Sequence, residues 1–197
     1  MFLVRRSLTA VAGAALVALT ATVARAQQSA GGQMACCAGG MGQMSPMPES
    51  YRALQVRMLE NERTLIVHMI DSMPAPYFRE KATPEQRDFG QQLYHCAAAL
   101  GLLARFAGAP RPAFADTANG FDKNGLKAYV NAAYDWAESF ARTQPATDRE
   151  AMVTFFGAQM PKWQILDELH QHTMWTLGQT VANFRMHGMA PASFMFF

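Results

Sequence analysis

The sequence predicts an all-α protein whose domain, residues 49–197, is an antiparallel four-helix bundle. Apolar residues recur at every third or fourth position along four long segments, which is the spacing of one buried helix face. No segment alternates apolar and polar residues for long enough to form a strand. Half of the 197 residues are hydrophobic, and a chain of this length can bury a sizeable core. Four amphipathic helices of these lengths are typical of a bundle.

The first predicted helix runs from about Glu49 to Met73. Its buried face carries five apolar residues: Leu54, Met58, Leu65, Met69 and Met73. Pro74 and Pro76 follow and end the helix, because proline has no backbone N–H to donate and its ring clashes with the preceding turn.

The second helix is predicted to begin beside Thr83, which is a good N-cap. Pro84 then takes the first helical position and Gln86 completes a capping box. The apolar stripe of this helix extends to Leu103, and Gly108 stops it.

Two more helices complete the predicted bundle. The third runs from about Asp122 to Arg142, and the fourth from about Pro161 to His187, with Gly188 in the position that favours a left-handed C-cap. The residues between them, 149–156, are expected to be helical or irregular.

Residues 1–26 have the layout of a cleavable export signal. Arg5 and Arg6 give a basic start, an apolar run follows over residues 8–23, and the triplet Ala24, Arg25 and Ala26 resembles a cleavage site. We expect a mature chain that begins at Gln27 and is periplasmic or extracellular, with the general secretory and twin-arginine routes both open. No other apolar run is long enough for a stable membrane span.

The charge balance gives no sign of a nucleic-acid partner. The chain has 17 basic and 15 acidic residues, and loss of the three signal arginines would leave 14 basic residues and a net charge of −1. Nucleic-acid-binding domains usually carry a marked basic excess. The three cysteines allow at most one internal disulfide, so the stability of the fold must come from packing.

Residues 27–48 form an uncharged arm that is rich in glycine, methionine and cysteine. The arm has no helical or strand periodicity, so we expect it to be flexible. It offers soft sulfur donors that suit Cu(I): Met34, Cys36, Cys37, Met41, Met44 and Met47. A low-complexity spacer is the alternative interpretation.

The fourth helix contains the segment LHQHTMWTLGQT, in which His170 and His172 are two residues apart. Side chains at this spacing point about 200° apart around a helix, so the two cannot easily hold one ion. His170 and His187 are expected at the surface or at the helix end. In the second helix, His95 is followed by Cys96, which we interpret as a buried apolar residue because adjacent helical side chains diverge.

Two stretches of the chain resemble the DinB/YfiT-like bundle proteins. The first is MIDSMPAPYFREKATPEQRDFGQQLYHCAAA, and the second is HTMWTLGQTVANFRMHGMAPASF. The resemblance covers residues 49–194. It implies a four-helix bundle that binds a divalent metal through three histidines, one on the second helix and an H-x-x-x-H pair on the last. Some relatives in this family are thiol-dependent transferases or isomerases.

This resemblance assigns the family's ligand positions in the present chain. The second-helix histidine corresponds to His95. Alignment on Gly178-Gln179 places the first histidine of the last-helix pair at His172 and the second at Thr176. A hydroxyl is a poor ligand for Zn²⁺ or Ni²⁺ beside imidazole. We therefore expect a degenerate site that binds these metals weakly or not at all.

Other residues near this site leave alternatives open. Asp167 and Glu168 offer carboxylates, but both precede His172 by about one turn and neither occupies the expected ligand position. His95 and His172 are alternatively two buried imidazoles that hydrogen-bond inside the bundle, with Thr176 or Tyr94 as further partners. Replacement of Thr176 by histidine is predicted to restore tight metal binding.

Three functions are compatible with the sequence, and whether the protein is an enzyme stays open. The leading hypothesis is an exported DinB-like bundle with a degenerate divalent-metal site and a binding or stress-related role toward a small-molecule ligand, as a monomer or a homodimer. The second is a metal-dependent, thiol-using transferase or isomerase that acts on a small electrophile. The third is periplasmic copper handling through the arm.

Overall fold

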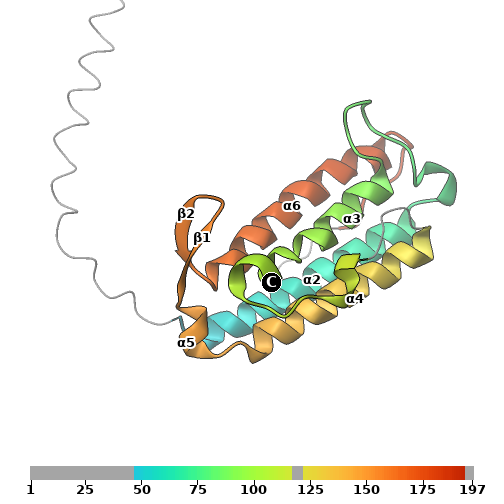
Figure 1. The fold of residues 1–197 in the computed structure, drawn as a ribbon. Helices are drawn as coiled ribbons and strands as arrows, with labels where there is room; N and C mark the ends of the chain where they lie inside the picture. The colour runs from blue at the N-terminus through green and yellow to red at the C-terminus, as the bar shows by residue number, and fades with distance from the viewer. Residues whose placement is uncertain (1–46, 117–121, 194–197) are drawn as a thin grey trace, which may run out of the picture. The chain divides into compact units, whose positions relative to one another are not determined.

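The computed structural model describes residues 47–116 and 122–193, which are mostly helical (Figure 1). The elements in chain order, labelled as in Figure 1, are α2 (Glu49–Ser72), α3 (Phe89–Ala99), α4 (Lys123–Thr143), α5 (Ala146–Arg149), β1 (Met152–Phe155), β2 (Ala158–Pro161) and α6 (Gln164–Arg185). The expected export signal and the arm up to residue 46 lie outside the described residues.

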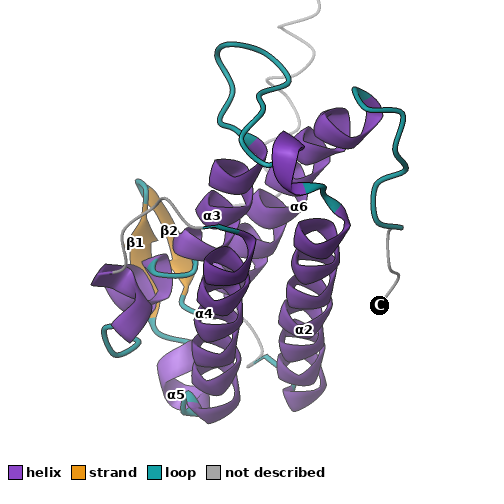
Figure 2. Cartoon of the chain, turned by 90° about the vertical axis from the view of Figure 1, so that its right-hand side faces the viewer, coloured by secondary structure: helices purple, strands orange, loops and turns teal. Residues whose placement is uncertain are grey.

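The four long helices α2, α3, α4 and α6 share one hydrophobic core. α2 packs along α4, α3 packs along both α6 and α4, and α2 also contacts α6 (Figures 1 and 2). The centre of the core is made of fully buried side chains from all four helices: Ile66, Ile70, Leu93, Tyr134 and Phe184. Within the described parts of the chain, no helix is both long and apolar enough to cross a membrane.

The start of α3 differs from the prediction. The helix begins at Phe89 rather than beside Thr83, because Asp88 is the N-cap. The Asp88 carboxylate accepts a hydrogen bond from the Gln91 backbone N–H at 2.7 Å, and the Gln91 side chain accepts one from the Asp88 N–H at 3.1 Å. This reciprocal pair is a complete capping box. It satisfies backbone N–H groups at the start of α3, the role that the prediction gave to Thr83.

The first turn of α3 packs tightly against the segment that follows α2. A Cβ atom built on Gly90 would lie 2.6 Å from Cε1 of Phe78, so only glycine permits this approach. The neighbouring Phe89 ring packs edge-on against Phe78 and against Phe184 of α6, with ring centroids 5.5 Å and 5.6 Å apart. These contacts hold α3 beside α6 and thereby position His95.

The expectation of an all-α chain is confirmed only in part: the described chain is mostly helical, but residues 152–161 form a β-hairpin. β1 and β2 are antiparallel, and Phe155 pairs with Ala158 around a two-residue turn. Phe156 and Gly157 both have positive φ, 46° and 92°, which is the pattern of a type I′ turn. Each strand has four residues, too few for alternation to stand out in the sequence. The β-branched and aromatic residues of β1, Val153 to Phe155, favour the strand.

The hairpin lies beside the start of α6, where α3 also ends (Figure 1). β2 contacts α6, and β1 contacts the π-helical turn Leu103–Ala107 that follows α3. The Phe155 ring packs edge-on against Phe106 of this turn, with ring centroids 5.0 Å apart. π-Helical turns are frequent at functional sites. The corner formed by this turn, the hairpin and the start of α6 is therefore a candidate functional site.

Candidate functional site

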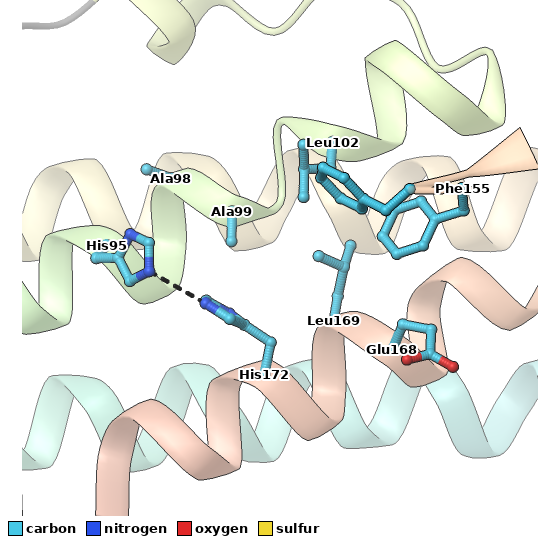
Figure 3. Close-up of a pocket in the computed structure, with 9 residues that line it drawn as sticks. His95, Ala98, Ala99, Leu102, Phe155, Glu168, Leu169 and His172 are labelled. Atoms are coloured by element: carbon cyan, nitrogen blue, oxygen red, sulfur yellow. Dashed lines mark hydrogen bonds between the residues drawn. The ribbon is translucent and has the colours of Figure 1, made fainter. Parts of the chain in front are cut away.

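A cavity of about 550 Å³ lies between α3, α6 and the hairpin (Figure 3). Its walls are mostly apolar and come from all three elements: Ala98, Ala99, Leu102, Phe155, Phe156 and Leu169. Its polar residues are His95, His172 and Glu168. Figure 3 shows the two histidines at one end of the cavity and Phe155 with Glu168 toward the other.

The structure brings His95 of α3 and His172 of α6 into direct contact. Their Nε2 atoms lie 3.1 Å apart, which is a hydrogen-bond distance, and their rings meet nearly edge to face with centroids 4.9 Å apart. A hydrogen bond between two imidazoles needs one N–H and one lone pair, so at least one ring of the pair is neutral.

Burial keeps both imidazoles in the neutral form. The pKa of His95 is lowered by desolvation, then by the nearby positive charge of Arg87, then by His172. The pKa of His172 is lowered by desolvation and by Arg87. Since free histidine already titrates below pH 7, the pair carries no net charge at neutral pH.

The environment of the second ring nitrogen of His172, Nδ1, indicates which of the two rings donates this hydrogen bond. His172 Nδ1 is buried and has no hydrogen-bond partner among the described residues. An unmatched lone pair is a smaller penalty than a buried N–H without an acceptor. We therefore assign the proton of His172 to Nε2, from which it is donated to Nε2 of His95.

The side chains around this pair do not fit a tightly held divalent metal. Metal-bound histidines normally donate their other ring N–H to a carboxylate or carbonyl, but residues 47–116 and 122–193 offer no such acceptor to His172 Nδ1. Thr176 is buried in the core near Cys96, and it is not among the described residues that line the cavity. In the described parts of the chain, no group of three or more His, Cys, Asp or Glu side chains is placed to hold an ion.

The two acidic residues of α6 do not replace the missing ligand in this arrangement. Asp167 faces α2, where it accepts hydrogen bonds from the Tyr51 hydroxyl at 2.9 Å and from the Gln55 amide at 2.8 Å. Glu168 lines the cavity one turn before His172. Helical side chains lean toward the N-terminus of their helix. The His172 side chain therefore leans toward the turn that carries Glu168, whereas the Glu168 side chain leans away from His172.

His170 lies in a buried network rather than at the surface, contrary to the prediction. Its Nδ1 contacts the carboxylate of Glu62, which also accepts a hydrogen bond from the Tyr134 hydroxyl at 3.0 Å. Glu62 is 2% exposed, and burial raises the pKa of its carboxyl group, opposed by His170 and then Tyr134. The signal for this network was a carboxylate on the apolar face of the first helix, four residues after Met58 and seven before Met69.

The remaining candidates are mostly structural. Cys96 is fully buried, and burial raises the pKa of its thiol, so it is not a thiolate at neutral pH. His187 stacks on Tyr77 and pairs with Glu80 at 2.9 Å. The Met47 thioether contacts the Arg149 guanidinium at 2.9 Å, whereas the arm's other candidate copper ligands, residues 34–44, lie outside the described residues.

No protein-family model matches the sequence, and no curated protein matches it. The fold, however, is similar to those of two solved DinB-like proteins. One, from Bacillus cereus, has a TM-score of 0.55 and 15% sequence identity, over 72% of this chain and 95% of that one. The other, from Bacillus subtilis, has a TM-score of 0.57 and 8% identity, over 72% and 96%. At these identities the likeness shows the fold, and the chain has a DinB-like fold.

Proposed function

We propose that this protein is an exported binding protein built on an antiparallel four-helix bundle, whose cavity between α3, α6 and the hairpin holds a small, mainly apolar molecule. The observation that carries the proposal is the cavity itself, about 550 Å³ in volume and closed at one end by the neutral His95–His172 pair. Small-molecule sites typically occupy about 300–1,000 Å³.

The chemistry of the lining supports binding of an apolar body with a polar group at its end. Six of the nine described lining residues are apolar. An apolar ligand that leaves water and packs against them gains free energy from the hydrophobic effect. The imidazole pair is neutral, so it does not demand a charged ligand at that end. His95, which is half-buried in the lining, offers its second ring nitrogen for a hydrogen bond that would fix the orientation of a ligand, as a few polar groups do in most ligand sites.

The bundle and the export route rest on separate arguments. The proposal of a four-helix bundle is supported by the packing of α2 with α4, of α3 with α6 and with α4, and of α2 with α6. Export rests on the signal features of residues 1–26, with the domain beginning near residue 49. A metal-dependent transferase is the less favoured function, because it needs an ion that this donor set does not fit.

A neutral fluorescent probe tests the binding function. N-phenyl-1-naphthylamine is expected to bind the purified protein at one site, with a rise in fluorescence on leaving water. Ala99→Trp fills the cavity and is expected to weaken binding at least about tenfold. Ala53→Trp places the same side chain on the exposed face of α2 and serves as the matched control. Equal probe affinity in Ala99→Trp and wild type would remove the cavity as the binding site.

A further inference from the structure

Glu168 is a carboxylate that the apolar cavity does not explain. It lies half-buried in the cavity lining. Its carboxylate has neither a hydrogen-bond nor an ion-pair partner in residues 47–116 and 122–193. A cation bound in the cavity would give this carboxylate a charged partner.

Phe156 is the second residue that packing alone does not explain. It is 69% exposed, although it lines the cavity. Its φ of 46° lies in the left-handed region, which bulky residues avoid and in which asparagine or glycine is favoured. Strained backbone of this kind concentrates at ligand-binding sites. The exposed phenyl ring at the turn therefore points to a role in binding rather than in folding.

Two aromatic rings, those of Phe155 and Phe156, line the cavity, and both pack against Phe106, which is not in the lining. The Phe156 ring lies 5.2 Å from Phe106 and 4.8 Å from Phe155, and Phe106 and Phe155 are 5.0 Å apart, all between ring centroids. The faces of aromatic rings carry negative potential and attract ammonium groups. Figure 3 shows Glu168 on the same side of the cavity as Phe155. An aromatic ring and a carboxylate therefore lie at the same end of the cavity.

We propose that the cavity selects small organic cations, with an ammonium group held by Glu168 and the rings of Phe155 and Phe156. The apolar body of the ligand lies along Ala99, Leu102 and Leu169, toward the neutral imidazole pair. This inference rests on the proposed binding function and names its ligand class. Among the described residues that line the cavity, Glu168 is the only charged one, which favours an amine over a carboxylic acid. Arg87, near the histidine end, would attract an acid instead.

Three probes of similar shape test whether the cavity prefers a cationic, a neutral or an anionic ligand. 3-Phenylpropylamine, 3-phenylpropan-1-ol and 3-phenylpropionate share one apolar body and differ in the charge of their end group. In calorimetric titrations of the purified protein at pH 7.5, the amine is expected to bind about tenfold more tightly than the alcohol, and the acid most weakly. Glu168→Gln is expected to weaken the amine about tenfold and to leave the alcohol within about twofold.

The outcomes separate this inference from the proposed function. If the alcohol binds but the amine has no advantage, or if the acid binds most tightly, the cation site is refuted while the binding cavity stands. If none of the three probes binds while N-phenyl-1-naphthylamine does, the cation site is refuted and the binding cavity stands; if N-phenyl-1-naphthylamine also fails to bind, the binding function fails. An amine preference that survives unchanged in Glu168→Gln would also refute the role of this carboxylate.

Variants at the hairpin tip test the aromatic part. Phe156→Asn creates the favoured Asn-Gly turn sequence, so it removes the ring without loss of the hairpin. We expect it to weaken amine binding about fivefold, whereas Phe156→Tyr keeps binding within about twofold. Met152→Asn changes an exposed residue of the same hairpin that does not line the cavity and is the matched control. Wild-type amine affinity in Phe156→Asn would refute the contribution of the ring.

Discussion

His95 and His172 are joined by a single hydrogen bond between their Nε2 atoms, 3.1 Å long, which links α3 to α6 at one end of the cavity. The bond requires that at least one ring be neutral. It therefore makes the contact between these helices dependent on pH, and it occupies one ring nitrogen of each of the two histidines that the family resemblance assigns to a metal.

Acidification is predicted to weaken the fold through this pair. Both histidines have folded-state pKa values below the ordinary value. A lowered pKa of a base contributes stability that is present above the unfolded-state pKa, near 6.5, and is lost as the pH falls through the folded-state value. Thermal unfolding should therefore show a fall in Tm below about pH 6.5 that is smaller in the His95→Gln, His172→Gln double variant. Identical pH profiles would contradict the assignment.

The hydrogen bonds of the buried Glu62 carboxylate with Tyr134 and His170 are predicted to contribute to the stability of the fold. Glu62→Ala leaves the Tyr134 hydroxyl and the His170 ring without their acceptor, which should lower the free energy of unfolding by about 2–4 kcal/mol. Glu62→Gln keeps an acceptor and should cost about 1 kcal/mol or less. Urea denaturation measures both, and equal effects would contradict the network.

The raised pKa of Glu62 gives a further pH dependence of opposite sign. Its contribution to stability is fully present below the unfolded-state pKa, near 4.5, and is lost as the pH rises through the higher folded-state value. The stability of Glu62→Gln relative to wild type should therefore increase as the pH rises above 4.5. A constant difference between pH 4 and pH 8 would show that the carboxyl group titrates normally.

Phe156→Asn is predicted to stabilise the protein while it weakens ligand binding. Relief of the positive φ at a bulky residue should add about 0.5–1 kcal/mol, or a rise in Tm of about 1–4 °C for a domain of this size. Phe155→Asn should destabilise, because the Phe155 side chain packs against Phe106. Differential scanning calorimetry distinguishes the two, and a lower Tm for Phe156→Asn would mean that the ring supports the fold.

Two glycines are predicted to respond oppositely to alanine. Gly90→Ala would bring a Cβ atom to 2.6 Å from the Phe78 ring and should cost about 1–3 kcal/mol. Gly178 lies in α6 with open space around its Cα, so Gly178→Ala should stabilise by about 0.5–1 kcal/mol. Chemical denaturation of both variants checks the close packing at the start of α3, which equal effects would refute.

The long helices were predictable from the sequence because their apolar spacing persists over many turns. The predicted first helix, residues 49–73, agrees with α2, and Gly188 has the positive φ expected of a C-cap. The start of α3 was not predictable in the same way, because Thr83 and Asp88 both precede plausible capping partners. Only tertiary contacts, such as the packing of Gly90 on Phe78, decide between them.

The candidate site was predictable in part. The family resemblance brought His95 and His172 together, although they are 77 positions apart in the chain. Phe156 was missed as a cavity residue, because a four-residue strand gives no alternation signal. Glu168 was considered only as a metal ligand, one turn from the expected position, and not as part of a cavity lining. Glu62 on the apolar face of the first helix was a sequence signal for a buried carboxylate, but its partner His170 is known only from the packing of α2 against α6.

Elemental analysis of the purified protein tests the central claim most directly. After incubation with one equivalent of Zn²⁺ or Ni²⁺ and gel filtration, wild-type protein should retain well under one equivalent of metal, as should His172→Ala, because the imidazole pair is hydrogen-bonded to itself and lacks a third ligand. Stoichiometric metal in the wild type that is lost in His172→Ala would contradict the account and favour the metal-dependent enzyme.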